Sequence, residues 1–225
     1  GISSIQLNNL ERGFSFKSKD NLDMSMGLTD TSAEEVVNNL SEQKLKLIIK
    51  VLGDENEASK IAKNIVKARS LKKITKVNQL VQIIEKSKKK VFKKKINPCT
   101  KTFQALRIFV NKEISELIKG ITSATKILKP GGMILVLSFH SIEDKIVKYF
   151  FNNHSTNRSK PSRYFPEETT NKSLFESYKN KIFKPSNKEI NVNAPSRSAK
   201  LRFAIRNNNK FEYSDDLTSK FAKYL

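Results

Sequence analysis

The chain has 225 residues, of which 37% are hydrophobic, and its 43 Lys and Arg residues against 22 Asp and Glu residues give a net charge of +21. This composition indicates a globular protein with one good core and at most a smaller second lobe, and it excludes a membrane-spanning helix and, with the single cysteine Cys99, an intramolecular disulfide. The charge favours a polyanionic partner, nucleic acid before an anionic membrane surface, although lysine-rich codon usage alone would also raise it.

Four short amphipathic helices are predicted between residues 31 and 87. In the first, Ser32 is the expected N-cap and Glu35 its capping-box partner. We expect Gly53 to end the second helix. Apolar residues recur every three or four positions in each: Ala33, Val36, Val37 and Leu40; Leu45, Ile48, Ile49 and Leu52; Ala58, Ile61, Ala62 and Ile65; Val77, Leu80, Val81 and Ile84. Together these segments predict a small helical lobe.

A longer helix is predicted from about residue 102 to 128, because its apolar residues keep the same helical spacing for most of that length. Pro130 and the two glycines after it end this helix. The continuous apolar run 133–137 then predicts a strand that is buried on both faces and therefore central in a sheet.

Ser138, Phe139, His140 and Ser141 follow at the carboxyl end of this strand, where open α/β sheets bind their ligands. Ser141 is the expected N-cap of the next helix, with Asp144 as its capping-box partner. A strand, a polar corner and a helix form half of a βαβ unit. The expected fold class is therefore α/β.

The last third of the chain is more polar. Residues 152–180 are rich in Asn, Ser, Lys and Pro, which predicts a variable loop that contributes little to the core. Two short strands, 181–184 and 200–206, are expected to form an antiparallel pair. The densest basic run, residues 86–95, is either a solvated helix end or a track for phosphates.

Six segments occur in order along the chain: ERGFSF (11–16), LDMSM (22–26), TKTFQALRIFVNKE (100–113), LKPGG (128–132), SFHSIEDKIVK (138–148) and SRSAKLR (196–202). Together they resemble the MraW-like family of bacterial-type 16S ribosomal RNA cytosine-N4 methyltransferases. The resemblance extends over the whole chain except residues 152–180. It implies a partial class I methyltransferase, in which residues 1–30 and 100–225 belong to a Rossmann-like sheet domain and residues 31–99 form an inserted small helical domain.

The resemblance also implies an activity, a cofactor and a partner. The activity is methylation of the N4 amine of a cytidine, the cofactor is S-adenosylmethionine, and the partner is small-subunit ribosomal RNA or the assembling subunit. In the family, the segment that matches residues 1–7 is preceded by a glycine-rich cofactor loop and an acidic strand end. We therefore expect a chain that is truncated at its N-terminus and inactive alone, in which Gln6 is the one matching cofactor contact.

Three positions depart from the family pattern. Ser25 and Pro195 stand where the family usually has arginine, and each removes a fork that would bind phosphate. Lys145 replaces a frequent arginine and keeps the charge without the planar geometry. These departures weaken the expected contacts to RNA.

The sequence does not identify a catalytic base, and the candidates are His140 and Asp23. His140 follows the predicted strand, where it would orient the base or accept a proton; the alternative is a ring that only bonds a neighbouring loop. Asp23 offers an acceptor for the N4 amine, and the alternative is a residue that only forms a turn.

Five residues are candidates for contact with RNA: Ser138, His140, Phe14, Arg197 and Arg202. Phe14 would stack on a base, or it packs beneath its own loop. Arg197 and Arg202 would bind phosphate, although Arg202 alternates with core residues and would equally decorate a solvated face.

The remaining expectations concern metals, partners and location. The two histidines and the cysteine lack zinc-like spacing, so we expect no structural metal. We expect no membrane partner and a cytoplasmic location, and the sequence leaves a homodimer open. The alternative function is a non-catalytic basic RNA-binding protein that retains the methyltransferase scaffold.

Overall fold

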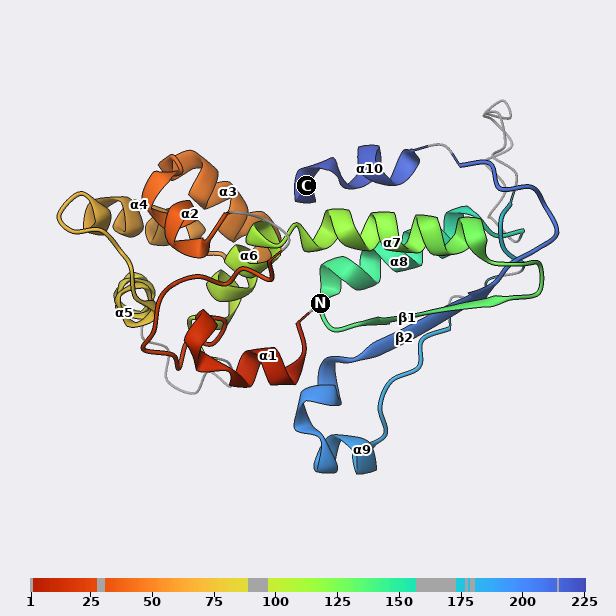
Figure 1. The fold of residues 1–225 in the computed structure, drawn as a ribbon, viewed down its shortest axis with the longest axis horizontal. Coiled ribbons are helices and arrows are strands. Elements are labelled where there is room, and N and C mark those ends of the chain that lie inside the picture. The colour runs from red at the N-terminus through yellow and green to blue at the C-terminus, as the bar shows by residue number, and fades with distance from the viewer. Residues whose placement is uncertain are drawn as a thin grey trace. The chain divides into compact units, whose positions relative to one another are not determined.

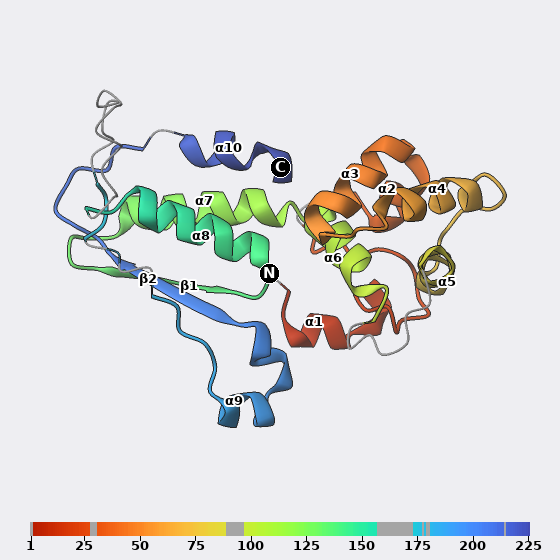
Figure 2. The ribbon, with the colours of Figure 1, turned by 180° about the vertical axis from the view of Figure 1, so that it is seen from behind.

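The computed structural model describes residues 2–27, 31–88, 97–156, 173–176, 178, 181–213 and 215–225. These residues form two compact units, an N-terminal unit of residues 2–113 and a C-terminal unit of residues 114–223. The N-terminal unit is built from helices, and the C-terminal unit combines helices with two strands (Figures 1 and 2). The chain is therefore a mixed α/β protein.

The N-terminal unit confirms the four helices predicted between residues 31 and 87. Its elements are α1 (Ser4–Asn8), η1 (Leu10–Arg12), α2 (Ala33–Asn39), α3 (Glu42–Gly53), α4 (Ala58–Arg69), α5 (Val77–Ser87) and α6 (Thr100–Val110). The capping box at α2 is also confirmed, since the Ser32 hydroxyl accepts a hydrogen bond from the backbone of Glu35 at 3.1 Å. Helix α3 packs against both α4 and α6, and the predicted apolar positions fill the core between them.

Helix α3 ends at Gly53 as predicted, but Gly53 is not the residue in the left-handed conformation. It is the last helical residue, and the left-handed C-cap is Asp54, with φ of +49°. A Cβ atom on Gly53 would lie 2.5 Å from the carbonyl oxygen of Lys101 in α6. The glycine therefore allows the close approach of two helices rather than a turn.

The single helix predicted over residues 102–128 is wrong. Helix α6 ends at Val110, Lys112 has a left-handed φ of +48°, and α7 (Glu113–Ile127) begins directly afterwards. The apolar spacing continues through the break, so the pattern could not reveal it. The boundary between the two units along the chain falls next to this break, between residues 113 and 114, and the predicted domains 1–30 with 100–225 and 31–99 stay a prediction.

The C-terminal unit combines a two-stranded sheet with helices. Its elements are α7, β1 (Met133–Ser138), α8 (Ser141–Asn153), α9 (Asn187–Val192), η2 (Ala194–Ser198), β2 (Lys200–Ile205) and α10 (Asp216–Phe221), with η3 (Ala222–Tyr224) at the end of the chain. The strands are antiparallel, with Ser138 opposite Lys200 and Met133 opposite Ile205. Helices α7 and α8 lie on the same side of this pair in both views (Figures 1 and 2).

The prediction that the strand at 133–137 is central and buried on both faces is wrong in this structure. Ile134 and Ser138 are buried on the face that α8 covers, whereas Met133, Leu135 and Leu137 are 47%, 57% and 53% exposed on the other face. Within the described residues β1 pairs with β2 alone. An apolar run shows that both faces are apolar, but it does not show what covers them.

The predicted strand at 181–184 is reduced to one antiparallel bridge. Phe183 and Leu201 exchange two backbone hydrogen bonds, of 3.0 and 2.9 Å, so these two segments pair as expected. Much of the predicted loop 152–180 lies outside the described residues. The part that is described contradicts the expected lack of core, since Phe175 is fully buried and packs edge-on against the rings of Phe150 and Phe151.

No helix in the described parts of the chain is long and apolar enough to cross a membrane. Cys99 lies fully buried in the core of the N-terminal unit, and burial raises the pKa of its thiol to about 12. The thiol is therefore not a nucleophile at neutral pH.

Candidate functional site

In the N-terminal unit, the segments ERGFSF and LDMSM form one rigid turn. The backbone N–H of Met24 donates to the carbonyl of Arg12 at 2.8 Å, and Met24 itself has a left-handed φ of +58°. Gly13 has φ of +69°, and a Cβ atom there would lie 2.4 Å from the carbonyl oxygen of Asn21. Glycine is therefore required where the two segments touch.

Asn111, at the end of α6, ties this turn to the helical core. Its amide oxygen accepts from the backbone of Met26 at 2.7 Å, and its amide nitrogen donates to the carbonyls of Met24 and Arg107 at 2.8 and 2.9 Å. The residue is only 2% exposed. A buried side chain with three backbone partners fixes the turn firmly.

Asp23 lies in this fixed turn. One carboxylate oxygen accepts from the backbone N–H of Ser25 at 3.3 Å, and the other lies 4.0 Å from Nε of Arg12. Its carbonyl accepts from the backbone N–H of Ala33, at the start of α2. Asp23 thus forms the turn that was weighed as its alternative role, while its side chain stays 37% exposed and can still accept a hydrogen bond.

Phe14 and Gln6 both have structural partners. Phe14 is 5% exposed within the helical core, so its ring is packed as the alternative reading expected. Gln6 lies in α1, where its amide oxygen accepts from the backbone of Ser3 at 2.9 Å in a capping box. The amide nitrogen of Gln6 is the part of this side chain that can still contact a ligand.

In the C-terminal unit, the antiparallel register brings two other segments to one end of the sheet. SFHSIEDKIVK begins at the carboxyl end of β1, and SRSAKLR runs through η2 into the start of β2. Ser138 is 1% exposed, and no described group forms a hydrogen bond with its hydroxyl. The next residue, Phe139, is 48% exposed. A buried hydroxyl and an exposed aromatic ring therefore lie next to each other in the chain.

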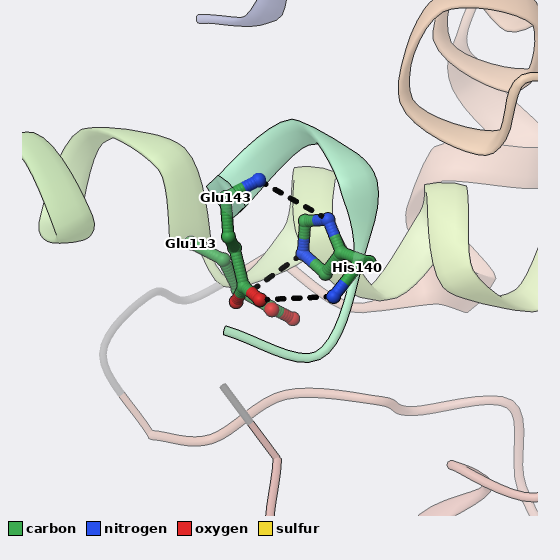
Figure 3. Close-up of side chains that lie close together, drawn as sticks. All are labelled: Glu113, His140 and Glu143. Atoms are coloured by element: carbon green, nitrogen blue, oxygen red, sulfur yellow. Dashed lines mark hydrogen bonds and ion pairs between the residues drawn. The ribbon is translucent and has the colours of Figure 1, made fainter. Parts of the chain in front are cut away.

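His140, not Ser141, is the N-cap of α8, and Glu143, not Asp144, completes the capping box. Nδ1 of His140 accepts from the backbone of Glu143 at 3.5 Å, and Nε2 lies 3.2 Å from the Glu143 carboxylate (Figure 3). An imidazole nitrogen can accept a hydrogen bond from a backbone N–H of the first helical turn, as a serine hydroxyl does. The N-cap therefore lies one residue earlier than predicted. Both ring nitrogens thus face the first turn of the helix.

Glu143 is held in its charged form by this arrangement. Its carboxylate also accepts from the backbone N–H groups of Phe139 and His140, at 2.9 and 3.3 Å. Burial alone would raise its pKa, but these hydrogen bonds and His140 lower the pKa to about 2. Glu113, also labelled in Figure 3, pairs with Arg107 of its own unit at 2.7 Å.

Arg202 is buried, contrary to its expected place on a solvated or RNA-binding face. Its guanidinium donates to Asp144 at 2.8 and 3.3 Å and to the hydroxyl of Tyr178 at 2.8 Å, and it is 2% exposed. Lys200 donates to the same carboxylate at 3.1 Å. Burial would raise the pKa of Asp144, but the two cations lower it. Arg202 therefore stabilises the fold, whereas Arg197 is exposed on η2.

The basic run 86–95 is described only at its start. Lys86 is exposed, but Lys88 is partly buried and forms an ion pair with Glu55. Residues 89–95 lie outside the described residues.

The sequence analysis missed two features: the exposed ring of Phe139 and the hydrogen bonds by which Asn111 holds the turn. The motif SFHS contained the first signal, since a large aromatic ends a strand, and nothing local marked the second.

Comparison with known proteins identifies relatives of this chain. Residues 1–207 match the MraW methylase family. Three relatives named ribosomal RNA small subunit methyltransferase H come from Parvibaculum lavamentivorans, Bartonella henselae and Bartonella bacilliformis; they are 41%, 42% and 44% identical over 92%, 96% and 92% of this chain. The matched regions make up 61%, 62% and 62% of these relatives. The chain therefore spans less than two thirds of the length of the curated relatives it matches.

Proposed function

Because this chain belongs to the MraW methylase family, we propose that it takes part in methylation of the N4 amine of a cytidine in small-subunit ribosomal RNA, with S-adenosylmethionine as cofactor. The match over residues 1–207 is the observation that carries this proposal. The names of the relatives and the net charge of +21 support an RNA substrate. A cytoplasmic location is part of this proposal, and the free, buried Cys99 agrees with a reducing compartment.

The proposed architecture follows the family resemblance. Residues 31–99 are an inserted helical domain, and residues 1–30 with 100–225 belong to a Rossmann-like domain. The packing of helices on one side of β1 and β2 supports the second assignment. Gln6 is the proposed contact to S-adenosylmethionine, and its amide nitrogen fits one polar contact. No wider cradle for the cofactor is assigned to the described residues.

Methyl transfer to an exocyclic amine depends mainly on positioning. When bound, S-adenosylmethionine supplies the methyl group. The protein must hold the amine in line with that group and take up the proton that the nitrogen loses. Because the amine is a hydrogen-bond donor, the protein needs an acceptor. Asp23 fits this role: its carboxylate is exposed, and Asn111 fixes the turn that bears it.

His140 is the second candidate for this acceptor. Its ring lies at the end of β1, but its two nitrogens face the backbone and carboxylate of Glu143. This geometry favours His140 as a positioning residue that shapes the corner, beside the buried hydroxyl of Ser138. Phe139 replaces Phe14 as the proposed stacking platform for a base, because its ring is 48% exposed and that of Phe14 is buried.

The test measures transfer of a radiolabelled methyl group from S-adenosylmethionine to small-subunit RNA and to isolated small subunits. Both the 225 residues and the longest form that the gene encodes should be assayed, with nucleoside analysis of the product. Asp23→Asn should lower kcat by about 100-fold or more, since it removes the charged acceptor. Asp20→Asn alters another exposed acid of the same unit and should leave kcat unchanged.

Two results would contradict the proposal. A methylated product other than N4-methylcytidine would reject the proposed reaction, and tight RNA binding without any transfer by either form would favour a non-catalytic RNA-binding protein. Equal activity of the Asp23 and Asp20 variants would show that Asp23 is not the acceptor, while the proposed methylation would stand. A loss of activity in His140→Gln alone would then assign the acceptor to His140.

A further inference from the structure

Helix α4 carries an unusual charge pattern. Its sequence, ASKIAKNIVKAR, contains four cations and no acidic residue. Lys60, Lys63 and Lys67 are all exposed, and their spacing of three and four residues aligns them along one face of the helix. Ile61 and Ile65 are fully buried on the opposite face. The three lysines, called here the α4 stripe, therefore point away from the core of the unit.

The α4 stripe has no ion-pair partner within the described residues. Nearby cations do have structural partners: Lys73 pairs with Glu34 at 2.6 Å, and Arg69 donates to the carbonyl of Val37 at 2.7 Å. Like charges three or four residues apart on a helix repel each other and cost a few tenths of a kcal/mol. The cations that form ion pairs or hydrogen bonds within the unit are thus separate from the stripe, of which only Lys67, in the last turn of α4, is favoured by the helix dipole.

The turn that follows α4 extends the same exposed region. Leu71 is 85% exposed and Lys72 is exposed beside it. In both views this turn protrudes at the end of α4 (Figures 1 and 2). A basic helix face of this kind resembles the positively charged surfaces that follow a phosphate backbone, and Leu71 beside it offers apolar contact area.

We propose that the α4 stripe binds the phosphates of a ribosomal RNA strand. This inference rests on the proposed function, which supplies RNA as the polyanion. The stripe spans about 10 Å along the helix axis, a length over which a nucleic-acid strand presents several phosphates. Lysine contacts phosphate as a point charge and carries no base preference. The stripe therefore contributes affinity and orientation, and the choice of cytidine comes from elsewhere.

The experiment measures binding of small-subunit RNA by fluorescence anisotropy over a series of salt concentrations, without S-adenosylmethionine. The test variant is K60Q/K63Q/K67Q, since glutamine keeps helix propensity and removes charge. The matched control is K44Q/K46Q/K50Q, which removes three exposed lysines from the neighbouring helix α3 and changes the net charge equally. Thermal melts should show that both variants stay folded.

The α4 variant should bind at least about tenfold more weakly than the unaltered protein at moderate salt, and the slope of log K against log salt should fall by about 2, from three lost contacts. The α3 variant should change the slope by less than about 1. Equal effects of the two variants would show that binding depends on bulk charge alone and would overturn the inference, as would an unchanged slope. Methyl transfer is measured separately, so failed transfer with stripe-dependent binding would reject the proposed function and leave this inference standing.

Discussion

Glu143 and His140 link the chemistry of single residues to the stability of α8. The pKa of Glu143 is lowered to about 2 from 4.5, so the folded state binds its proton less readily than the unfolded state. The stabilisation is therefore complete above about pH 4.5 and is lost as the pH falls from there towards 2. We expect Glu143→Gln to cost on the order of 2 kcal/mol near neutral pH and much less near pH 3.

Urea unfolding at several pH values, followed by circular dichroism, measures this difference. Glu189 is exposed on helix α9, so Glu189→Gln is a suitable control. Parallel pH profiles for the unaltered protein and the Glu143 variant would show that the surroundings do not lower the pKa of the Glu143 carboxyl group.

Arg202 and Arg197 provide a matched pair, one buried and one exposed, within a single segment. Replacing Arg202 by methionine leaves Asp144 buried with Lys200 as its remaining cation, and we expect a loss of about 3–5 kcal/mol of folding free energy. Arg197→Met should change stability by less than about 0.5 kcal/mol, because the side chain is exposed. Denaturant melts measure both changes.

The same two substitutions should affect RNA binding in the opposite order, with the larger effect at Arg197. Arg197→Met should weaken binding while the protein stays folded, since its guanidinium is free to reach phosphate. If the folded Arg202 variant binds RNA as weakly as the Arg197 variant does, Arg202 also contributes to RNA binding.

At the scale of whole elements, Asn111 joins the end of α6 to a turn that is distant in the sequence. It ends α6 and holds the turn that bears Asp23, through its bonds to Met24 and Met26. Asn111→Ala leaves two buried backbone groups without partners, and we expect a cost of about 2–4 kcal/mol. Amide hydrogen exchange over residues 22–26 should become faster, and kcat should fall more than the affinity for RNA.

A control for this prediction removes a comparable side chain elsewhere in the unit. Asn64 donates to the hydroxyl of Ser87 at 2.8 Å, and its replacement by alanine should destabilise the unit without accelerating exchange in the turn. If both variants loosen residues 22–26 equally, Asn111 acts through global stability and not through the turn.

The same elements show what local sequence can and cannot predict. Helices α2 to α5 were predictable because apolar spacing and the Ser32 cap are local signals. The break at Asn111 was not, since its partners at Met24 and Met26 are 87 and 85 residues away. The burial of Arg202 depends likewise on Asp144, which is 58 residues away. Non-local polar partners were therefore the main source of error.

The family motifs predicted which segments matter but not the role of each side chain. The SFHS motif correctly indicated a strand end, a polar corner and a helix, yet His140 turned out to be the cap that Ser141 was expected to be. Phe14, a candidate for stacking on a base, is buried, whereas Phe139, for which the sequence analysis predicted no role, is 48% exposed. A motif fixes position along the chain, whereas exposure depends on packing across the whole unit.

At the scale of the whole molecule, the C-terminal unit presents an uncovered apolar face. Opposite residues in an antiparallel pair share a face, so Leu135 and Phe203, and likewise Leu137 and Leu201, lie side by side. The ring of Phe183 lies 5.8 Å from that of Phe203 and extends this surface. A pair of strands that is covered on one face only is marginally stable by itself. A contiguous apolar surface of this kind binds other apolar molecules.

We therefore expect the 225-residue chain to bind the dye 1-anilinonaphthalene-8-sulfonate while folded, and the double variant Leu135→Thr with Leu137→Thr to lower the bound fluorescence to roughly half or less. Threonine keeps strand propensity while it removes apolar area. The control, Leu47→Gln with Ile127→Gln, removes two exposed apolar side chains from helices and should leave most of the signal. Dye binding that is equal in both variants would place the apolar surface elsewhere. Binding that is lost in the strand variant alone would show that the uncovered face of β1 and β2, and not a loosened core, is the accessible apolar surface of this chain.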